Sequence, residues 1–472
     1  MRTPLVVIIA SMSLLTACSD THRAEPSTQN TASIRDASVH RRAIEAVIWG
    51  MPAVNYERML AAAAANGARP NQVVYWSRPL NWKTQNLTPN PDTIYFQPFY
   101  DTTAGPVVLE VPASDGGCVI VGSVDNGWQV ALEDAGVAGM DKGKGGKYLI
   151  TPPGYTGATP DGYFVLRSDT YRGFAILRSN FKSRSDADIA AAVAHGKKMR
   201  LYPLGGDAGS TVFVDVFDKP YDATIPYDAS FFDSLNRFVQ AEPWITRDKA
   251  VIDSLRTVGI EKGKPFAPDA DRRAALGAAA VEARAYLNMK YEAGYAEPFF
   301  AGTHWAMPFS KEALEGVPSN FADPSSYVLD ERAVMYSIAY FSAKHLGAGQ
   351  FYLLNTCDRS GAALDGGKTY RLRVPADAPV EQYWSVTAYD RETHALIVGV
   401  PRPSLASNDA SVQKNADGST DVYFGPRAPA GKESNWVPTD AGRGFELLFR
   451  LYGPKKALFE KSWKLPDVEE VK

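Results

Sequence analysis

Val-Val-Leu-Glu-Val-Pro-Ala at residues 107–113 has a counterpart at residues 370–376, which read Tyr-Arg-Leu-Arg-Val-Pro-Ala. In both stretches apolar residues alternate with variable ones, which is typical of a β-strand, and both stop at the same Val-Pro-Ala. Each is followed by another strand-like run that ends in an aspartate, at Asp125 and Asp390. This similarity predicts two copies of an antiparallel β domain in one chain.

Helical patterns flank and separate the two β regions. Ser38 is a suitable N-cap for a first helix, which Pro52 should break, and a second helix over residues 53–65 should end at the Asn-Gly of residues 66–67. Between the β regions, three stretches have few helix breakers and clear start or stop signals: residues 246–258, 271–291 and 330–345. The sequence therefore predicts an α+β, β-rich fold whose two β domains are joined by a mainly helical segment.

The predicted boundaries follow from these patterns. We expect an N-terminal β domain with leading helices at 38–225, a helical connecting region at 226–347 and a C-terminal β domain at 348–472. Residues 18–37 are polar, with nothing to bury, and are expected to form a flexible tether.

The first residues predict an export signal. Arg2 precedes a short apolar run, and residues 15–18 read Leu-Thr-Ala-Cys, which resembles the lipobox of bacterial lipoproteins. The resemblance implies a signal peptide at 1–17 and acylation of Cys18, and Ser19 favours an outer-membrane lipoprotein facing the periplasm. The alternative is a plain signal peptide with an incidental cysteine. No later run is long and apolar enough to span a bilayer, so the lipid would be the sole membrane attachment.

Composition excludes one class of partner and suggests another. The 472 residues carry a net charge of -3, which provides no basic field to hold a nucleic-acid backbone. The chain has 23 Tyr, 21 Phe and 9 Trp, and this excess of aromatic residues suits strands and structured loops. Aromatic walls with a few polar groups are typical of sites for a small molecule or a polymer.

The standard catalytic motifs are absent. The sequence contains no Gly-x-Ser-x-Gly, no His-Glu-x-x-His, no phosphate-binding Walker loop and no Cys-x-x-Cys, so no organic cofactor is indicated. The six histidines include no pair at metal-ligand spacing within one element, although a divalent cation held by distant residues stays open. No metal ligand is therefore assigned.

The densest group of polar residues with chemical potential lies at residues 88–95, Thr-Pro-Asn-Pro-Asp-Thr-Ile-Tyr. Asp92 is a candidate general base or cation ligand, Asn90 an orienting donor, and Tyr95 a donor or stacking surface for a substrate. The alternative is an Asx-Pro turn that only caps a strand.

Further candidate residues lie outside this motif. Trp82 upstream, and Asp125 and Trp128 downstream, are candidate substrate-binding residues in an aromatic cleft, and His304 is a candidate acid or base. The alternative for the aromatic residues is a Tyr- and Trp-rich core, and the alternative for His304 is a surface or structural role.

Several motifs, taken in order, carry a family resemblance. They are Trp-Gly-Met-Pro at 49–52, Asn-x-Asp-Thr-x-Tyr at 90–95, Pro-Pro-Gly-Tyr at 152–155, Leu-Asp-Gly at 364–366, Tyr-Trp-Ser-Val-Thr-Ala-Tyr-Asp at 383–390, Asn-Trp-Val-Pro at 435–438 and Arg-Leu-Tyr-x-Pro at 450–454. With them the chain resembles the paired bacterial domain-of-unknown-function families 1254 (N-terminal) and 1214 (C-terminal), over nearly all its length beyond the tether. The resemblance implies two jelly-roll-like β domains joined by helices, and it implies no established reaction.

Two classes of function remain open at this point. The first is an envelope hydrolase with acid–base or metal-assisted chemistry on a small polar or aromatic substrate, because acid–base residues are available and no redox motif is. The second is a non-catalytic lipoprotein that binds a ligand or an envelope polymer in the same cleft. The position of Asp92 separates them: a base needs a concave pocket and a titratable neighbour.

Overall fold

The computed structural model describes residues 28–115, 117–294, 297–340, 343–345 and 349–471. The predicted signal peptide at 1–17 and the predicted lipidation site Cys18 lie outside the described residues. None of the helices in the described part of the chain is long and apolar enough to cross a membrane.

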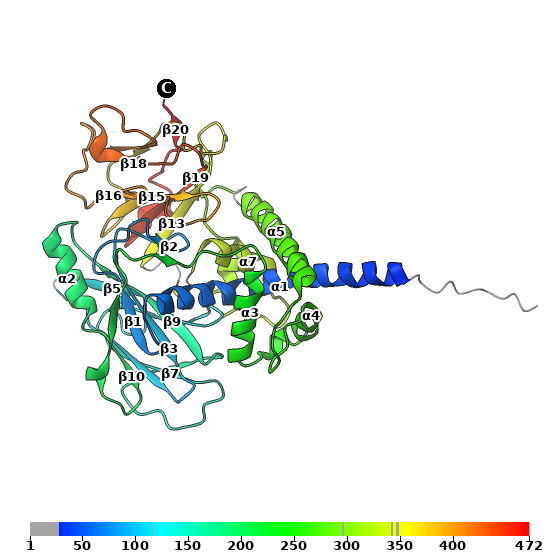
Figure 1. The fold of residues 1–472 in the computed structure, drawn as a ribbon. Coiled ribbons are helices and arrows are strands. Elements are labelled where there is room, and N and C mark those ends of the chain that lie inside the picture. The colour runs from blue at the N-terminus through cyan, green and yellow to red at the C-terminus, as the bar shows by residue number, and fades with distance from the viewer. Residues whose placement is uncertain (1–27, 116, 295–296, 341–342, 346–348, 472) are drawn as a thin grey trace, which may run out of the picture.

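A long N-terminal helix, α1 (Thr28–Ala65), runs from the outside of the molecule into its centre (Figure 1). It begins well before Ser38, so residues 28–37 are helical where a flexible tether was predicted. It also continues through Pro52, where a break was expected. Residues 46–57 are buried all round the helix, and this packing offsets the hydrogen bond that a proline removes. The predicted stop is confirmed, since Gly67 has φ +88° and donates to the Ala64 carbonyl at 2.9 Å.

The N-terminal β region is a sandwich of two sheets that enclose one apolar core. The six-stranded sheet has the order β11-β1-β3-β9-β5-β6, and the four-stranded sheet has the order β10-β4-β7-β8. The strands of the first are β1 (Gln72–Tyr75), β3 (Ile94–Asp101), β5 (Val119–Asn126), β6 (Ala131–Ala135), β9 (Arg172–Asn180) and β11 (Phe213–Asp215); those of the second are β4 (Val107–Val111), β7 (Gly146–Thr151), β8 (Phe164–Arg167) and β10 (Arg200–Pro203). Two short strands, β2 (Thr84–Gln85) and β12 (Tyr221–Asp222), form a separate parallel pair.

The C-terminal β region is a second sandwich, which lies above the first in Figure 1. One sheet has the order β13-β19-β15-β16 and the other β18-β17-β14-β20. The strands are β13 (Gln350–Asn355), β14 (Tyr370–Val374), β15 (Trp384–Asp390), β16 (Ser404–Ala406), β17 (Thr420–Gly425), β18 (Trp436–Pro438), β19 (Phe445–Tyr452) and β20 (Glu469–Glu470). The two similar sequence stretches therefore form β4 and β14, each an inner strand of a four-stranded sheet.

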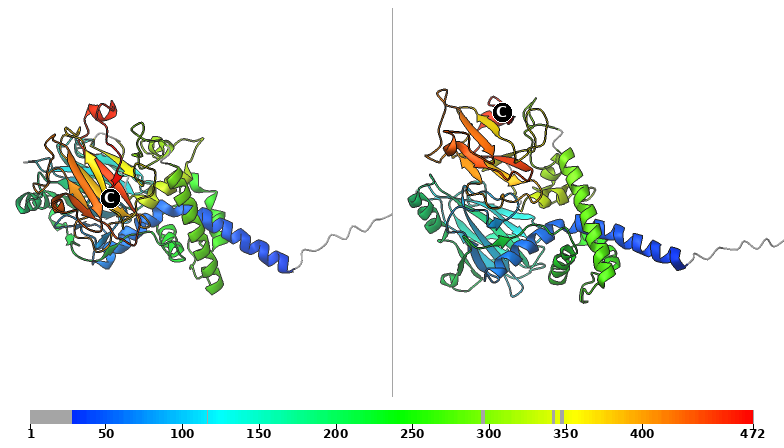
Figure 2. Two further views of the ribbon diagram at one scale, coloured as in Figure 1. Left: turned by 90° about the horizontal axis from the view of Figure 1, so that it is seen from above. Right: turned by 45° about the horizontal axis from the view of Figure 1, so that its top comes forward.

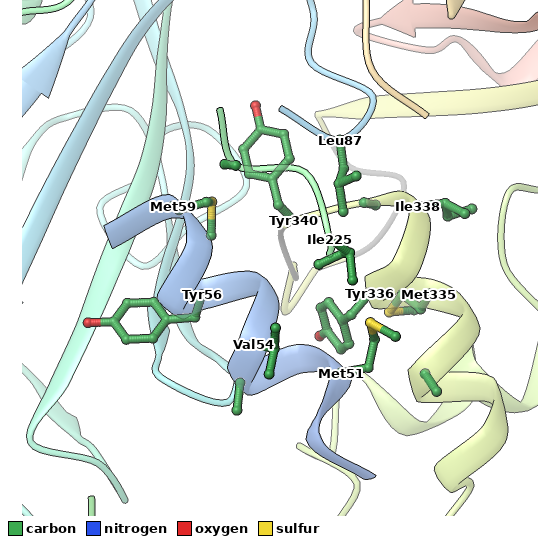
Figure 3. Packing of buried hydrophobic residues seen from close by; sticks show 14 of the residues in the cluster. Met51, Val54, Tyr56, Met59, Leu87, Ile225, Met335, Tyr336, Ile338 and Tyr340 are labelled. Atoms are coloured by element: carbon green, nitrogen blue, oxygen red, sulfur yellow. The ribbon is translucent and has the colours of Figure 1, made fainter. Parts of the chain in front are cut away.

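Helices form a third layer beside both sandwiches, which Figure 2 shows from two further directions. The helices that pack on α1 are α3 (Ser230–Ala241), α4 (Val251–Val258), α5 (Ala270–Ala293) and α7 (Leu329–Ile338). The shorter helices are α2 (Asp186–Gly196), α6 (Lys311–Gly316) and α8 (Lys456–Phe459), with 3₁₀ turns at Ala208–Ser210, Thr246–Asp248 and Glu433–Asn435. Figure 3 shows the packing between α1 and α7, in which Met51 and Val54 of α1 lie close to Met335 and Tyr336 of α7.

The predicted α+β class is confirmed, with two corrections. Helix and strand are present in nearly equal amounts, 27% and 25%, so the fold is not β-rich. The sheets are mixed, because β11 pairs with β1, β8 with β7 and β18 with β17 in parallel orientation. A parallel neighbour needs a long connection, and loops and helices of this chain provide it.

Candidate functional site

The loop before β3 belongs to the N-terminal β domain and contacts the C-terminal one. Asn90 and Asp92 are buried, with 1% and 0% of their surface exposed. The Asn90 side-chain oxygen accepts a hydrogen bond from the Asp92 N–H at 3.0 Å, which is an Asx turn. Its side-chain nitrogen donates to the hydroxyls of Tyr452 at 2.7 Å and Tyr383 at 3.3 Å, both from the C-terminal domain. Asn90 therefore positions the loop against the other domain.

The Asp92 carboxylate is held by two partners of its own. Arg184 forms an ion pair with Oδ1, and the Ser404 hydroxyl donates to the same oxygen at 3.0 Å. The Tyr383 hydroxyl donates to the Asp92 backbone carbonyl at 3.0 Å. Asp92 lines none of the pockets described below. These contacts make Asp92 an inter-domain clamp, which is a position that suits the turn alternative better than a general base.

Tyr95 lies on β3 at the same boundary. Its hydroxyl oxygen accepts hydrogen bonds from the Asn90 N–H at 2.9 Å and from Arg178 Nε at 3.3 Å. Burial alone would raise the pKa of Tyr95, but the positive charges of Arg178 and Arg450 outweigh it and hold the pKa below its ordinary value. Of the three residues of the motif, only Tyr95 lines one of the two inter-domain spaces described below.

Asp125 lies near the end of β5 and Trp128 follows that strand, on the side of the molecule where the helices pack. Trp128 is 3% exposed and packs edge-on against Trp49 of α1 and Phe238 of α3, each with ring centroids 4.8 Å away. Asp125 is fully buried, and its backbone carbonyl accepts a hydrogen bond from the Tyr100 hydroxyl at 3.0 Å. The core alternative therefore describes Trp128, because tightly packed indole rings leave no face for a ligand.

Trp82 and His304 lie elsewhere. Trp82 is partly buried in the turn before β2, and its carbonyl accepts a hydrogen bond from the Gln85 side chain at 2.6 Å. His304 is held at the C-terminal domain by Asp467, with 2.9 Å between Nδ1 and Oδ2. It lines neither of the two pockets between the domains. The structure thus brings Asn90, Asp92 and Tyr95 together and leaves Trp82, Trp128 and His304 apart from them.

An apolar pocket of about 270 Å³ opens between the two sandwiches and the helical segment. Most of the side chains that line it are apolar. They come from β5, from the end of β6 and the loop after it, from the segment before α6, and from β13: Val121, Ala135, Ala138, Met307, Pro308, Phe309, Phe351 and Tyr352. A pocket of this kind, at a junction of domains and with few polar groups, is the usual location of a small-molecule site.

A small inner cavity, about 20 Å³ in volume, adjoins this pocket and shares Pro308, Phe309 and Tyr352 with it. It lies between the facing sheets and is also lined by Ile338, the last residue of α7, and by Tyr340, which follows this helix; both residues are labelled in Figure 3. Two guanidinium groups, Arg178 from β9 and Arg450 from β19, line it. Their residues are only 3% and 1% exposed.

The pairing of strands explains why these charges meet. Directly paired residues of antiparallel strands share a face of the sheet. Arg178 is paired with Tyr95 on one side and Val121 on the other, and Arg450 is paired with Tyr352. The opposite faces of β9 and β19 carry Leu177, Phe449 and Leu451 into the two sandwich cores. Each sheet thus turns one apolar face inward and one polar face toward the other domain.

A histidine–aspartate pair lines the apolar pocket. Asp134 of β6 is buried, and it accepts hydrogen bonds from the Ser123 hydroxyl at 2.7 Å and from the backbone N–H of His345 at 2.7 Å. The His345 Nδ1 lies 3.1 Å from the same carboxylate, and 44% of its side chain is exposed. A carboxylate in this position fixes the orientation of an imidazole ring.

No group of three or more His, Cys, Asp or Glu side chains that could hold a metal ion occurs among the described residues. The residues that sequence reasoning missed are Arg178, Arg450, Asp134 and His345. A signal for Arg450 was present, because Glu446 and Arg450 are charged residues of one face in the otherwise apolar strand of residues 445–452. His345 and Asp134 are far apart in sequence, and nothing local connects them.

Two family models match the chain. The model "Protein of unknown function (DUF1254)" matches residues 70–203, and "Protein of unknown function (DUF1214)" matches residues 349–456. Together they cover about half of the chain. The chain therefore belongs to the proteins that combine an N-terminal DUF1254 domain with a C-terminal DUF1214 domain, which confirms the resemblance seen in the motifs.

Among solved structures, the chain is similar to the VPA0106 protein from Vibrio parahaemolyticus, with 20% identity and a TM-score of 0.57 over 92% of this chain and 100% of that one. This similarity shows a shared fold. An uncharacterized protein from Burkholderia cenocepacia matches with 12% identity and a TM-score of 0.42, over 94% of this chain and 97% of that one. Among curated proteins no sequence matches the chain.

Proposed function

We propose that the protein binds a small, largely apolar molecule in the pocket between its two β domains. One observation carries the proposal: apolar side chains from both domains and from the helical segment enclose a space of about 270 Å³. Burial of a ligand there would remove apolar surface of both partners from water, at about 25 cal/mol per Å². The ligand-binding alternative is thus favoured over hydrolysis at Asp92.

The inter-domain contacts support this role because they fix the walls of the pocket relative to each other. Asn90 and Asp92 of the N-terminal domain contact Tyr383, Tyr452 and Ser404 of the C-terminal domain. All five residues are buried, so their hydrogen bonds are shielded from water. A preformed pocket loses less conformational entropy when a ligand binds.

The test is binding of N-phenylnaphthylamine, an uncharged dye that fluoresces in apolar sites. Ala138→Trp would place an indole in the pocket, and the matched control Val137→Trp changes the adjacent residue, whose side chain is 58% exposed and does not line it. We expect saturable binding to the full chain and to Val137→Trp, and at least about tenfold weaker binding to Ala138→Trp. Equal binding to the two variants would remove the pocket from the proposal.

Hydrolysis is a second candidate function, and the His345–Asp134 pair favours it. In this scheme His345 takes a proton from a water that attacks an ester carbonyl, and returns it to the leaving oxygen. His304, which is also half-exposed and also held by an aspartate, provides a matched control. His345→Gln should abolish hydrolysis of nitrophenyl esters, whereas His304→Gln should not. Loss of activity in both variants, or in neither, would contradict the scheme.

We also propose that the chain is a lipid-anchored envelope protein, acylated at Cys18, with its β domains in the periplasm. The Leu-Thr-Ala-Cys of residues 15–18 supports this. Metabolic labelling with palmitate should mark the full chain and fail to mark Cys18→Ala, and labelling of both would refute it. We propose, in addition, that both sandwiches are jelly rolls.

A further inference from the structure

We infer that the ligand of the inter-domain pocket carries a carboxylate, and that Arg450 binds this group at the inner end of the pocket. The inference rests on the proposed ligand pocket and specifies the chemistry of its occupant. Long-chain fatty acids and aryl-substituted carboxylic acids share this chemistry, an apolar body with one small anionic head.

Arg450 is a buried cation whose described partners are neutral. Its guanidinium donates to the Thr387 hydroxyl at 3.0 Å, the Thr88 carbonyl at 2.8 Å and the Tyr389 hydroxyl at 2.6 Å. It also lies over the ring of Tyr352, 5.3 Å from its centroid. These contacts hold the side chain in place and bring no carboxylate to it. A buried cation is normally paired with an anion, because the low dielectric makes an isolated charge costly.

Arg178 supplies a second guanidinium group to the lining of the cavity. Arg178 contacts the Tyr95 hydroxyl through Nε and lies over the Tyr95 ring, 5.2 Å from its centroid. Because Arg178 and Arg450 line one cavity, their charges add at its centre. A positive potential in a space lined by buried side chains attracts an anionic group and strengthens its hydrogen bonds.

The charged inner cavity and the apolar pocket share part of their lining. Val121, next to Arg178 in the sheet, lines the apolar pocket, and Tyr352, next to Arg450, lines both spaces. A ligand whose body lies in the pocket therefore reaches the guanidinium groups with its end. The inner cavity, of about 20 Å³, has room for a group of one or two water-sized atoms. That size suits a planar carboxylate better than a tetrahedral phosphate or sulfate.

The experiment compares decanoate with decanol as competitors of N-phenylnaphthylamine on the full chain. The two molecules share the apolar body and differ in the head group. We expect decanoate to compete at least about tenfold better, since a charge-assisted hydrogen bond in a buried site is worth at least that factor. The preference should fall to about twofold or less in Arg450→Met, and Arg450→Lys, which keeps the charge, should retain part of it.

The controls separate this inference from the proposed function. Arg443→Met removes an arginine of the same domain that is paired with Asp390 and lies outside both spaces, and it should leave the preference unchanged. Equal competition by decanoate and decanol on the wild-type chain would overturn the inference and leave the pocket standing, without any variant being needed. A preference that persists in Arg450→Met would also overturn it. Failure of the dye itself to bind would overturn the proposed function instead.

Discussion

Two arginine clusters of this protein differ in the charge of the groups that surround the guanidinium. Arg172 is held by two carboxylates, with Nη2 3.0 Å from Glu57 and Nε 2.8 Å from Glu242, and it ties β9 to α1 and α3. Arg450 lies at the boundary of the two β domains, and its described hydrogen bonds go to a hydroxyl, a carbonyl and a phenol. Both arginines connect elements of the fold, yet only the second lines the space between the two β domains.

The difference separates a structural ion pair from a binding group. A guanidinium that already has its carboxylates gains little from another anion and contributes to the scaffold. A guanidinium surrounded by neutral groups is oriented by them and still lacks a counter-charge, so a ligand can supply one. Four predictions test this contrast, from the largest expected effect to the smallest.

Arg172→Met should destabilise the protein most. The variant leaves the buried Glu242 carboxylate without its cationic partner and leaves Glu57 with Arg237 alone, and breaking a buried ion pair in this way costs about 3–5 kcal/mol. Thermal and urea unfolding followed by circular dichroism would measure the loss. A stability within about 1 kcal/mol of wild type would show that this cluster does not hold the helices to the sheet.

Acidification should weaken the ion pairs that the buried Glu446 forms with Arg391 and His394. Burial alone would raise the pKa of this carboxyl, but His394 and Arg391 outweigh it, so its pKa lies below the ordinary value of 4.5. Because the unfolded chain then binds the proton more readily, this stabilisation is present above about pH 4.5 and is lost as the pH falls through the folded pKa.

Urea unfolding at pH 7 and at pH 4 would measure that slope. Glu446→Gln has no such proton to bind, and its stability should change less between the two pH values than that of wild type. An equal or steeper change in the variant would contradict the role given to Glu446.

Arg450→Met should cost much less stability than Arg172→Met, at about 1 kcal/mol. Loss of three hydrogen bonds to neutral groups is partly offset, because a buried charge is removed and an unbranched apolar side chain replaces it. Thermal and urea unfolding of both variants would measure this difference in stability. If Arg450→Met were as destabilising as Arg172→Met, Arg450 would belong to the scaffold.

Asp92→Asn should have the smallest effect, also about 1 kcal/mol or less, because Arg184 keeps 28% of its side chain in water and screening weakens the pair. Dye binding should be unchanged, since Asp92 does not line the pocket. Loss of dye binding at unchanged stability would instead return Asp92 to a ligand-binding role.

Local signals in the sequence predicted much of the fold. Ser185 caps α2 by accepting a hydrogen bond from the Asp188 N–H, and Gly259 ends α4 in the left-handed conformation; serine and glycine are residue types that favour these positions. The similar stretches formed equivalent inner strands. Pro52 misled because its local effect is overridden by tertiary packing around α1, which no helix rule contains.

The candidate site was harder to predict because it depends on pairing between distant strands. Asn90, Asp92 and Tyr95 lie within six residues of each other in the sequence, and hydrogen bonds group them in the structure. Arg178 and Arg450 are separated by most of the chain, and each looks like an isolated charge in a strand until the register is known. The face that a strand residue occupies can be inferred locally, whereas the element opposite it cannot.

The most direct test of the account is a crystal structure of the full chain with decanoate bound. The account predicts that the carboxylate lies within hydrogen-bond distance of the Arg450 guanidinium and that the alkyl chain lies along Val121 and Phe309. A carboxylate that points to solvent beside His345, or decanoate bound away from the space between the two β domains, would contradict it.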